Sequence, residues 1–310
     1  MNPLLGIGRG IDHLVIAVRD LETSRGQFRD VLGFTMSAVG KHPGGTENCV
    51  AGFRNKGYLE LLGVYDPNKE EDLTKFLERN EGAVALGLAV SSAENTASFL
   101  RSKGFEVDGP MEGTITFDGV GEAPPAFWRW VGIKNAEPAV RNVIFFIEYD
   151  DTARAAFRKK YPDAVEPSPR ESASTANHPN TALRIASVWV AVEDLEKATQ
   201  SYTSIGLRSV CELPFPQLNA IGREIEAGTG NIVLLQPEGL RGVTAEFLKQ
   251  REAAGIVGVS LEITDLETTR NLLEKRTSLR LSPYAGNKQH SLLVPPEFAS
   301  GIWIEMFEKS

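Results

Sequence analysis

One segment of this chain occurs four times, and this repeat constrains the fold more than any other feature. Residues 11–34 read IDHLVIAVRDLETSRGQFRDVLGF, and residues 185–207 read IASVWVAVEDLEKATQSYTSIGL. Both begin with an apolar run, pass through Val-x-Asp-Leu-Glu and end on Gly-apolar after about four helical turns. A third copy begins at Val257 and a weaker fourth at Val84. We therefore expect four similar structural units.

The first copy predicts the element order β-α-β-β-β. Asp20 stands where a helix N-cap belongs, and Gly33 follows the amphipathic stretch that it ends. The Gly/Pro-rich turn HPGGTEN leads into the middle one of three short strand candidates. We expect a helix at residues 21–32 and strands at residues 14–18, 35–39, 49–54 and 58–64.

The other units follow the same plan. We expect, in the second unit, a strand at residues 86–90, a helix at 93–103 and strands at 113–117, 126–132 and 142–148, and final strands at 231–236 and 301–307 in the third and fourth units. Residues 159–181 are rich in Pro, Ser and charge and lack an apolar period, as is typical of a linker. The chain is thus predicted to form domains at 8–155 and 183–310, joined by a linker at 156–182.

Composition excludes several classes of function. The net charge of −8 argues against a nucleic-acid or anionic-membrane partner, and no apolar run approaches the roughly 20 residues of a membrane span. No secretory signal is visible, and Cys49 and Cys211 form no close pair, which favours a reducing compartment. We expect a soluble, cytoplasmic protein whose partner is a small molecule, with a homodimer as the one assembly left open.

Four strands cannot shield both faces of their own sheet. Two units side by side can curl their sheets into a common open barrel with the helices outside, and a ligand would then lie in the enclosed cleft. The predicted fold class is α+β.

Five segments carry a family resemblance: IDHLVIAVRDL, GKHPGGTEN, GYLELLGV, VIFFIEYD and HPNTALRIASVWVAVEDL. They resemble the glyoxalase-like domain proteins of the vicinal oxygen chelate (VOC) superfamily, over nearly the whole chain except the linker and the first ten residues. The resemblance implies four βαβββ modules that pair into two open-barrel domains. The superfamily includes lyases, isomerases, dioxygenases, epimerases and binding proteins, so the resemblance is far more specific for fold than for activity.

The resemblance also implies a metal site, held by side chains from the first and last strands of two paired modules. Superposing the copies places His13, Ala85, Ser187 and Gly258 at the first-strand position, and Glu60, Glu148, Val233 and Glu305 at the last-strand position. The amino-terminal pair then offers His13, Glu60 and Glu148 to one divalent ion, such as Zn, Mn, Ni, Co or Fe(II). The carboxyl-terminal pair offers one carboxylate and is expected to be metal-free.

A structural role competes with this interpretation. A lone glutamate in a strand is usually solvated, and a lone histidine there is usually a hydrogen-bonded core residue. The three residues at superimposable positions together favour a site, although Ala85 stands where many metalloenzymes of the superfamily have His or Gln. His42 could replace the missing ligand or could only cap its own turn.

Further residues are predicted to contact a substrate. Trp128 and Trp130 should share one face of a strand and Arg129 the other. If the tryptophans face the cleft, they give it an apolar wall, and otherwise they pack in the core. If Arg129 faces the cleft instead, it offers a fork for a carboxylate, and without a bulge only one of these arrangements is possible. Asn48 follows the Gly-rich turn near the expected mouth, and Tyr58 should share a face with Glu60.

The first functional hypothesis is a metal-dependent enzyme that chelates two neighbouring substrate oxygens, with Glu148 or Glu60 moving a proton. Two carboxylates and one histidine favour lyase or isomerase chemistry over ring-cleaving dioxygenase chemistry. The alternative is a metal-free protein that binds an apolar small molecule, which Ala85 and the second half of the chain favour. An inactive scaffold is the third hypothesis.

Overall fold

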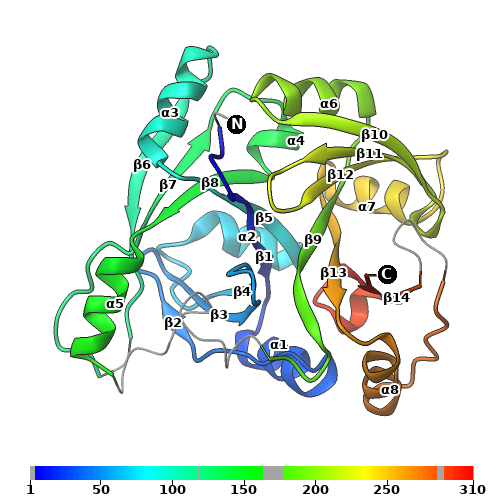
Figure 1. Ribbon diagram of the computed structural model, residues 1–310, viewed down its shortest axis with the longest axis horizontal. Coiled ribbons are helices and arrows are strands. Elements are labelled where there is room, and N and C mark those ends of the chain that lie inside the picture. Colours follow the sequence, from blue (N-terminus) through cyan, green and yellow to red (C-terminus); the bar gives the residue numbers. More distant parts are fainter. Residues whose placement is uncertain (1–3, 118, 163–176, 285–289, 310) are drawn as a thin grey trace.

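Two curled mixed β-sheets lie at the centre of the protein, with helices on their outer faces (Figure 1). The computed structural model describes residues 4–117, 119–162, 177–284 and 290–309. The first sheet has eight strands in the order β2-β3-β4-β1-β5-β8-β7-β6, and the second has seven in the order β10-β11-β12-β9-β13-β15-β14. Each sheet joins two modules of the same chain, which confirms the predicted α+β fold of paired modules.

The elements follow the repeat. The amino-terminal half contains β1 (Gly10–Ala17), α1 (Leu21–Gly26), η1 (Gln27–Val31), β2 (Gly40–Lys41), β3 (Thr46–Gly52), β4 (Tyr58–Val64), α2 (Glu71–Arg79), β5 (Gly82–Ala89), α3 (Ala93–Ser102), β6 (Val107–Gly113), β7 (Trp128–Ile133), α4 (Pro138–Arg141), β8 (Ile144–Tyr149) and α5 (Asp151–Lys160). The carboxyl-terminal half contains β9 (Ala182–Ala191), α6 (Leu195–Ser204), β10 (Arg208–Phe215), η2 (Pro216–Leu218), β11 (Ala220–Glu226), β12 (Asn231–Pro237), α7 (Val243–Arg251), β13 (Gly255–Ile263), α8 (Leu266–Arg276), β14 (Ser291–Val294), η3 (Pro296–Phe298) and β15 (Trp303–Glu308).

The repeated motif acts as a helix start. In all four modules a polar side chain accepts a hydrogen bond from the backbone N–H three residues later, which satisfies a donor that the first helical turn leaves open. The capping residues are Asp20, Ser92, Asp194 and Asp265. The repeated order of strand, cap and helix therefore has a local physical cause.

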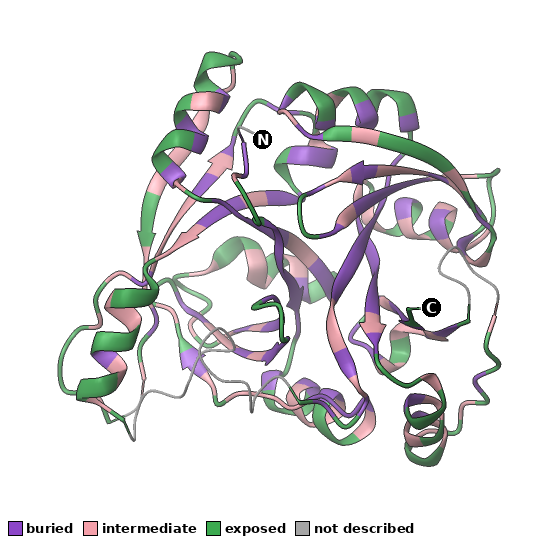
Figure 2. Ribbon diagram, in the orientation of Figure 1, coloured by how far each residue is buried: buried purple, intermediate pink, exposed green. Residues whose placement is uncertain are grey.

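The modules join through their first strands. Within each module the first strand pairs with the last in parallel, whereas β1 pairs with β5, and β9 with β13, in antiparallel. Residues of β1 alternate between the helix-facing side, where Leu14 and Ile16 join the main core, and the barrel interior, where His13 and Val15 lie. Figure 2 shows the buried central strands. The interior side of the first sheet therefore receives the polar side chains that matter below.

A β-bulge recurs at one position in every module. The pairing of β1 with β5 skips Asp12 in one strand and Val84 in the other, and the pairing of β9 with β13 skips Ala186 and Val257. Each extra residue comes directly before the first-strand position of its module. Because a bulge re-aims the neighbouring side chains, this repeat is an architectural feature.

The eight-stranded sheet is bridged across its two edges. Lys41 of β2 and Thr116, just beyond β6, exchange two backbone hydrogen bonds of 3.2 and 2.8 Å. Ile115 packs beside this bridge on Gly40, where an added Cβ would fall 2.2 Å from the isoleucine side chain. The amino-terminal sheet is thus closed into a barrel at this point.

Several predicted elements lie elsewhere in the structure. Residues 35–39 form no strand. The Ser37 N–H donates to Val50 of β3, but the Val50 N–H donates to the Ser37 hydroxyl and the Ser37 carbonyl accepts from Arg25, so no regular ladder forms. The strand expected at 113–117 is β6, at Val107–Gly113. Four helices, α2, α4, α5 and α7, were not predicted.

Both ends of the predicted linker include residues with described structure. Helix α5 extends to Lys160, inside the expected range of 156–182, and residues 163–176 lie outside the described residues. After this gap, His178 bonds to the Gly52 carbonyl through Nε2 (2.8 Å) and accepts from the Thr35 N–H through Nδ1 (2.9 Å). The end of the linker is therefore fixed to the first module. No helix in the described part of the chain is both long and apolar enough to span a membrane.

Candidate functional site

Strand register identifies the equivalent positions in the first two modules. In the first module His13 lies beside Tyr58, and Glu60 is two residues further along β4. In the second, Leu86 lies beside Ile144, so Ala85 aligns with Val143 and the residue two positions further is Phe145. The Glu60 position of the second module is therefore occupied by Phe145. Glu148 lies three residues further, and an odd spacing turns its side chain to the opposite face of the strand.

This register corrects the prediction that Glu148 shares a cleft with His13 and Glu60. The Glu148 carboxylate accepts a hydrogen bond from the backbone N–H of Ala93, the first residue of α3, at 2.9 Å, and one from Arg129 at 2.8 Å. The same helix-start contact is made by Gln236 in the third module and Glu308 in the fourth. Glu148 and Arg129 thus lie on the helix-facing side of the sheet.

His13 lies inside the barrel, 3% exposed. Its Nδ1 is 2.8 Å from Oδ2 of Asp12, and the Tyr149 hydroxyl donates to that same oxygen at 2.7 Å. Its Nε2 is 3.5 Å from Oε2 of Glu60. Burial lowers the pKa of His13 to about 4, and the Glu60 carboxylate acts in the opposite direction. The imidazole is therefore neutral at pH 7.

Aromatic rings and a glycine hold the imidazole in place. The Tyr58 ring stacks on it, with 4.5 Å between centroids and planes 3° apart, and Phe145 meets it edge-on at 5.3 Å. The hydroxyls of Tyr58 and Tyr149 are 2.9 Å apart, and burial raises the pKa of both phenols. On the remaining side, a Cβ added to Gly87 would lie 2.5 Å from the His13 ring.

Three more of the predicted substrate-contacting residues lie on the same side of the sheet as His13. Asn48 donates to Oε1 of Glu60 at 2.6 Å. Nδ1 of His42 bonds to the Thr46 hydroxyl at 2.9 Å, and the imidazole meets Trp128 edge-on at 5.9 Å. Burial lowers the pKa of His42, and the Glu60 carboxylate opposes this shift. His13, His42, Asn48, Tyr58, Glu60 and Trp128 thus face one region, and their roles toward a ligand stay predictions.

The barrel interior offers few donors for a divalent metal. Within residues 4–117, 119–162, 177–284 and 290–309, no three His, Cys, Asp or Glu side chains come close enough together to share one ion. His13 and Glu60 supply two donors, and Ala85 and Phe145, at the corresponding positions of the second module, supply none. Catalytic zinc sites usually have three protein ligands. The described residues do not fit such a site.

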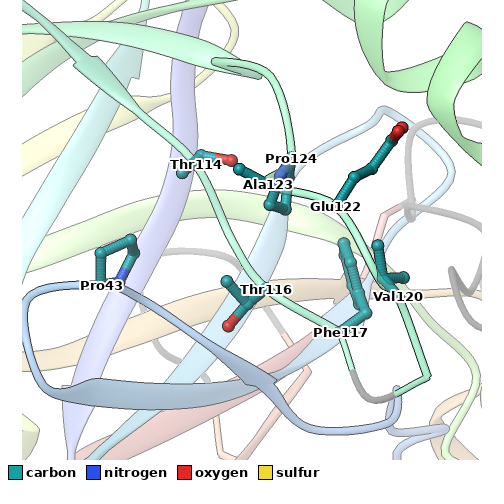
Figure 3. Close-up of a pocket in the computed structure, with 8 residues that line it drawn as sticks. All are labelled: Pro43, Thr114, Thr116, Phe117, Val120, Glu122, Ala123 and Pro124. Carbon is teal, nitrogen blue, oxygen red and sulfur yellow. The ribbon is translucent and has the colours of Figure 1, made fainter.

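A pocket of about 200 Å³ lies between the turn after His42 and the segment that follows β6 (Figure 3). Pro43 of the first module faces Phe117 and Val120 of the second across it. It is lined by Pro43, Thr114, Thr116, Phe117, Val120, Glu122, Ala123 and Pro124. Its surface is mostly apolar, which suits an apolar group of a ligand.

The carboxyl-terminal barrel has a filled interior. Trp189 stands at the position of Val15 in the first module, is fully buried and packs with Phe215. Its indole N–H donates to Ser260, which in turn donates to Glu305 at 2.6 Å. Ser187 also bonds to Ser260 at 3.0 Å. Of the positions expected from the repeat, Ser187 and Glu305 thus belong to a hydrogen-bonded core network.

Sequence reasoning missed Asp12 and Tyr149, which belong to the hydrogen-bonded group around His13. Neighbouring strand residues normally face opposite sides, so Asp12 next to His13 was not considered, and only the bulge lets their side chains meet. Tyr149 could have been found from the sequence. It follows Glu148 in β8, so strand alternation places its side chain on the opposite face, the interior side that Phe145 also faces.

The repeat, the paired barrels and the interior site define a member of the VOC superfamily. Within it, residues 11–206 match the family described as the glyoxalase-like domain, and the chain belongs to this family.

Two curated relatives are named mitochondrial methylmalonyl-CoA epimerase. The protein from Bos taurus is 29% identical over 146 residues, covering 44% of this chain and 83% of that protein. The protein from Mus musculus is 28% identical over 127 residues, covering 40% of this chain and 71% of that protein.

Solved structures resemble the whole chain in fold. A mutant of 4-hydroxymandelate synthase from Streptomyces coelicolor has a TM-score of 0.66 at 13% identity, covering 98% of this chain and 94% of that one. A hypothetical protein from Staphylococcus aureus has a TM-score of 0.59 at 15% identity, covering 96% of this chain and 98% of that one. At these identities the likeness concerns the fold alone.

Proposed function

We propose that the amino-terminal barrel is an enzyme site that removes and returns a proton at a carbon next to a carbonyl group. The observation that carries this proposal is the separation of 3.5 Å between Nε2 of His13 and Oε2 of Glu60 inside the barrel. Two proton acceptors that face each other at this distance can take up a proton and share it.

The state of His13 supports this chemistry. Its Nδ1 proton is directed to Asp12, which leaves the Nε2 lone pair toward Glu60. The depressed pKa keeps the ring neutral at pH 7, so its Nε2 lone pair carries no proton there. Asn48 holds the other oxygen of Glu60 and so fixes the direction of the carboxylate. Both groups are thus oriented before a substrate arrives.

The relatives support a substrate class. Both curated relatives are named epimerases. At a carbon next to a carbonyl group, epimerisation consists of removing one proton and returning it to the opposite face. We propose an acyl thioester or a related acid with an acidic C–H bond. His42 and Trp128 would contact its polar and apolar parts, and the pocket beside Pro43 would take an apolar group.

A second candidate is a binding protein without catalysis. Ala85 and Phe145, which replace ligands at two of the four interior positions, favour it, as does the apolar pocket. This protein would hold an apolar small molecule and would leave its C–H bonds intact.

Deuterium incorporation separates the two candidates. The protein is incubated in D2O with a panel of acyl thioesters that includes methylmalonyl-CoA, and mass spectrometry follows deuterium at the α-carbon. We expect incorporation with the natural chain, a loss of roughly 100-fold or more in Glu60→Gln and His13→Asn, and little change in Glu148→Gln.

Glu148→Gln is the matched control, because it alters a strand glutamate on the opposite face of the sheet and keeps its acceptor oxygen. Equal losses in Glu60→Gln and Glu148→Gln would contradict the proposed site. No incorporation with any compound, combined with saturable binding of one of them, would favour the binding protein.

A further inference from the structure

The Asp12 carboxylate is the point on which a chain of hydrogen bonds converges. Its Oδ2 lies 2.8 Å from Nδ1 of His13 and accepts from the Tyr149 hydroxyl at 2.7 Å. Because Tyr149 directs its single hydroxyl proton to Asp12, Tyr58 must be the donor in the 2.9 Å contact between the two tyrosines. The Tyr58 ring returns to His13 by stacking on its imidazole. These contacts join Asp12, His13, Tyr58 and Tyr149 into one group.

We infer that Asp12 is a positioning residue that holds His13 in the tautomer with its proton on Nδ1, so that Nε2 stays proton-free toward Glu60, and that Tyr149 only orients the Asp12 carboxylate. The catalytic meaning of this inference rests on the proposed function, but the tautomer itself does not. A ring nitrogen that faces a carboxylate at 2.8 Å carries a proton, and a neutral imidazole has only one.

The four bulges supply an internal comparison. The bulge residue is apolar in the three modules that lack a histidine at the next position, where Val84, Ala186 and Val257 precede Ala85, Ser187 and Gly258. It is an aspartate only in the module that has His13. The bulge is therefore common to the architecture, whereas its use to bring a carboxylate to an imidazole is particular to the first module.

Without Asp12 the imidazole of His13 would prefer the other tautomer. Nδ1 would lose the partner that takes its proton, while Glu60 would still stand 3.5 Å from Nε2. The proton would then move to Nε2 and be donated to Glu60. This change of tautomer removes the free Nε2 lone pair that proton abstraction needs. The new hydrogen bond also occupies one carboxylate oxygen of Glu60.

Nitrogen-15 NMR of the imidazoles measures the tautomer directly, in the full chain labelled at its 4 histidines. His178 is an internal reference for the opposite state, because its Nδ1 accepts from Thr35 and its Nε2 therefore donates to Gly52. We expect His13 to carry its proton on Nδ1 in the natural chain and in Tyr149→Phe, and on Nε2 in Asp12→Ala. Val84→Ala, which changes an equivalent bulge residue, should leave the tautomer unchanged.

Two results would overturn the inference: an Nε2 proton on His13 in the natural chain, or an Nδ1 proton that persists in Asp12→Ala. The spectrum of the natural chain decides the matter even if Asp12→Ala does not fold. In the deuterium assay, Asp12→Ala should lower kcat roughly 100-fold with a smaller change in KM. Absence of deuterium exchange in the natural chain would refute the proposed function and leave the tautomer result intact.

Discussion

The Glu148 carboxylate accepts the backbone N–H of Ala93 at 2.9 Å, which joins the end of β8 to the start of α3. Gln236 and Glu308 do the same for α6 and α8. A glutamate that the sequence suggested as a ligand is thus part of a repeated strand-to-helix contact.

This contact predicts that substitutions of Glu148 lower the stability of the fold but leave deuterium exchange in the amino-terminal barrel unchanged. Replacing Glu148 by alanine leaves the Ala93 N–H without its acceptor and should lower the free energy of unfolding by about 1 kcal/mol. Glu148→Gln should lose less, since Gln236 makes the same contact in the third module. Urea unfolding of both variants measures the difference, and equal losses would show that the charge, and not the acceptor oxygen, stabilises the helix start.

The buried histidines predict acid sensitivity. His13 and His178 both have a folded-state pKa lowered to about 4 by burial, below the ordinary value of 6.5. The unfolded chain therefore binds more protons between these values, so stability is complete above pH 6.5 and falls as the pH drops toward 4. Each histidine contributes a loss on the order of 3 kcal/mol over this range. His178→Gln should flatten the curve of unfolding free energy against pH, and an unchanged slope would contradict this account.

Gly87 predicts a steric requirement. An alanine there would place its Cβ 2.5 Å from the ring of His13, which is held by Tyr58 and cannot withdraw. Gly87→Ala should lose a few kcal/mol of stability and most of the deuterium exchange activity. Gly44→Ala is the control, because a Cβ at Gly44 meets no atom within 4 Å. A fully stable and active Gly87→Ala variant would show that the imidazole can move.

The donor set predicts the metal content. His13 and Glu60 alone should not retain an ion, so protein purified without chelator or affinity metal should contain well below one equivalent of Zn, Mn, Ni, Co or Fe. Treatment with EDTA should leave deuterium exchange and thermal stability unchanged. One equivalent of metal that is lost in Glu60→Gln but kept in Glu148→Gln would contradict the described geometry and would require a further ligand.

The fold was accessible from the sequence because its signals are local. The capping residues, the apolar alternation and the glycine that ends the first helix all act within a few residues of their own position. Repetition then extended the prediction to the weaker copies. Residues 35–39 were wrongly expected to form a strand because tertiary contacts, such as the bond from Arg25 to Ser37, decide their conformation.

The site was only partly accessible because it depends on register. Glu60 and Glu148 have nearly the same apolar surroundings in sequence, and a shift of three residues between them cannot be seen without the partner strand. Tyr58 was placed on the face of Glu60, since strand alternation alone decides that. The bulge at Asp12 breaks the alternation of side chains between the two faces of β1, and the local sequence contains no signal that predicts it.

The two barrels also touch through their backbones. The Ile11 N–H donates to the carbonyl of Ala227 at 3.1 Å, and a side chain at Gly228 would collide with the carbonyl of Arg9. Strands β5 and β13 pack against each other beside this contact (Figure 1). The protein should consequently melt in a single calorimetric transition, and a destabilising substitution in the filled carboxyl-terminal barrel should lower the melting temperature of the amino-terminal barrel as well.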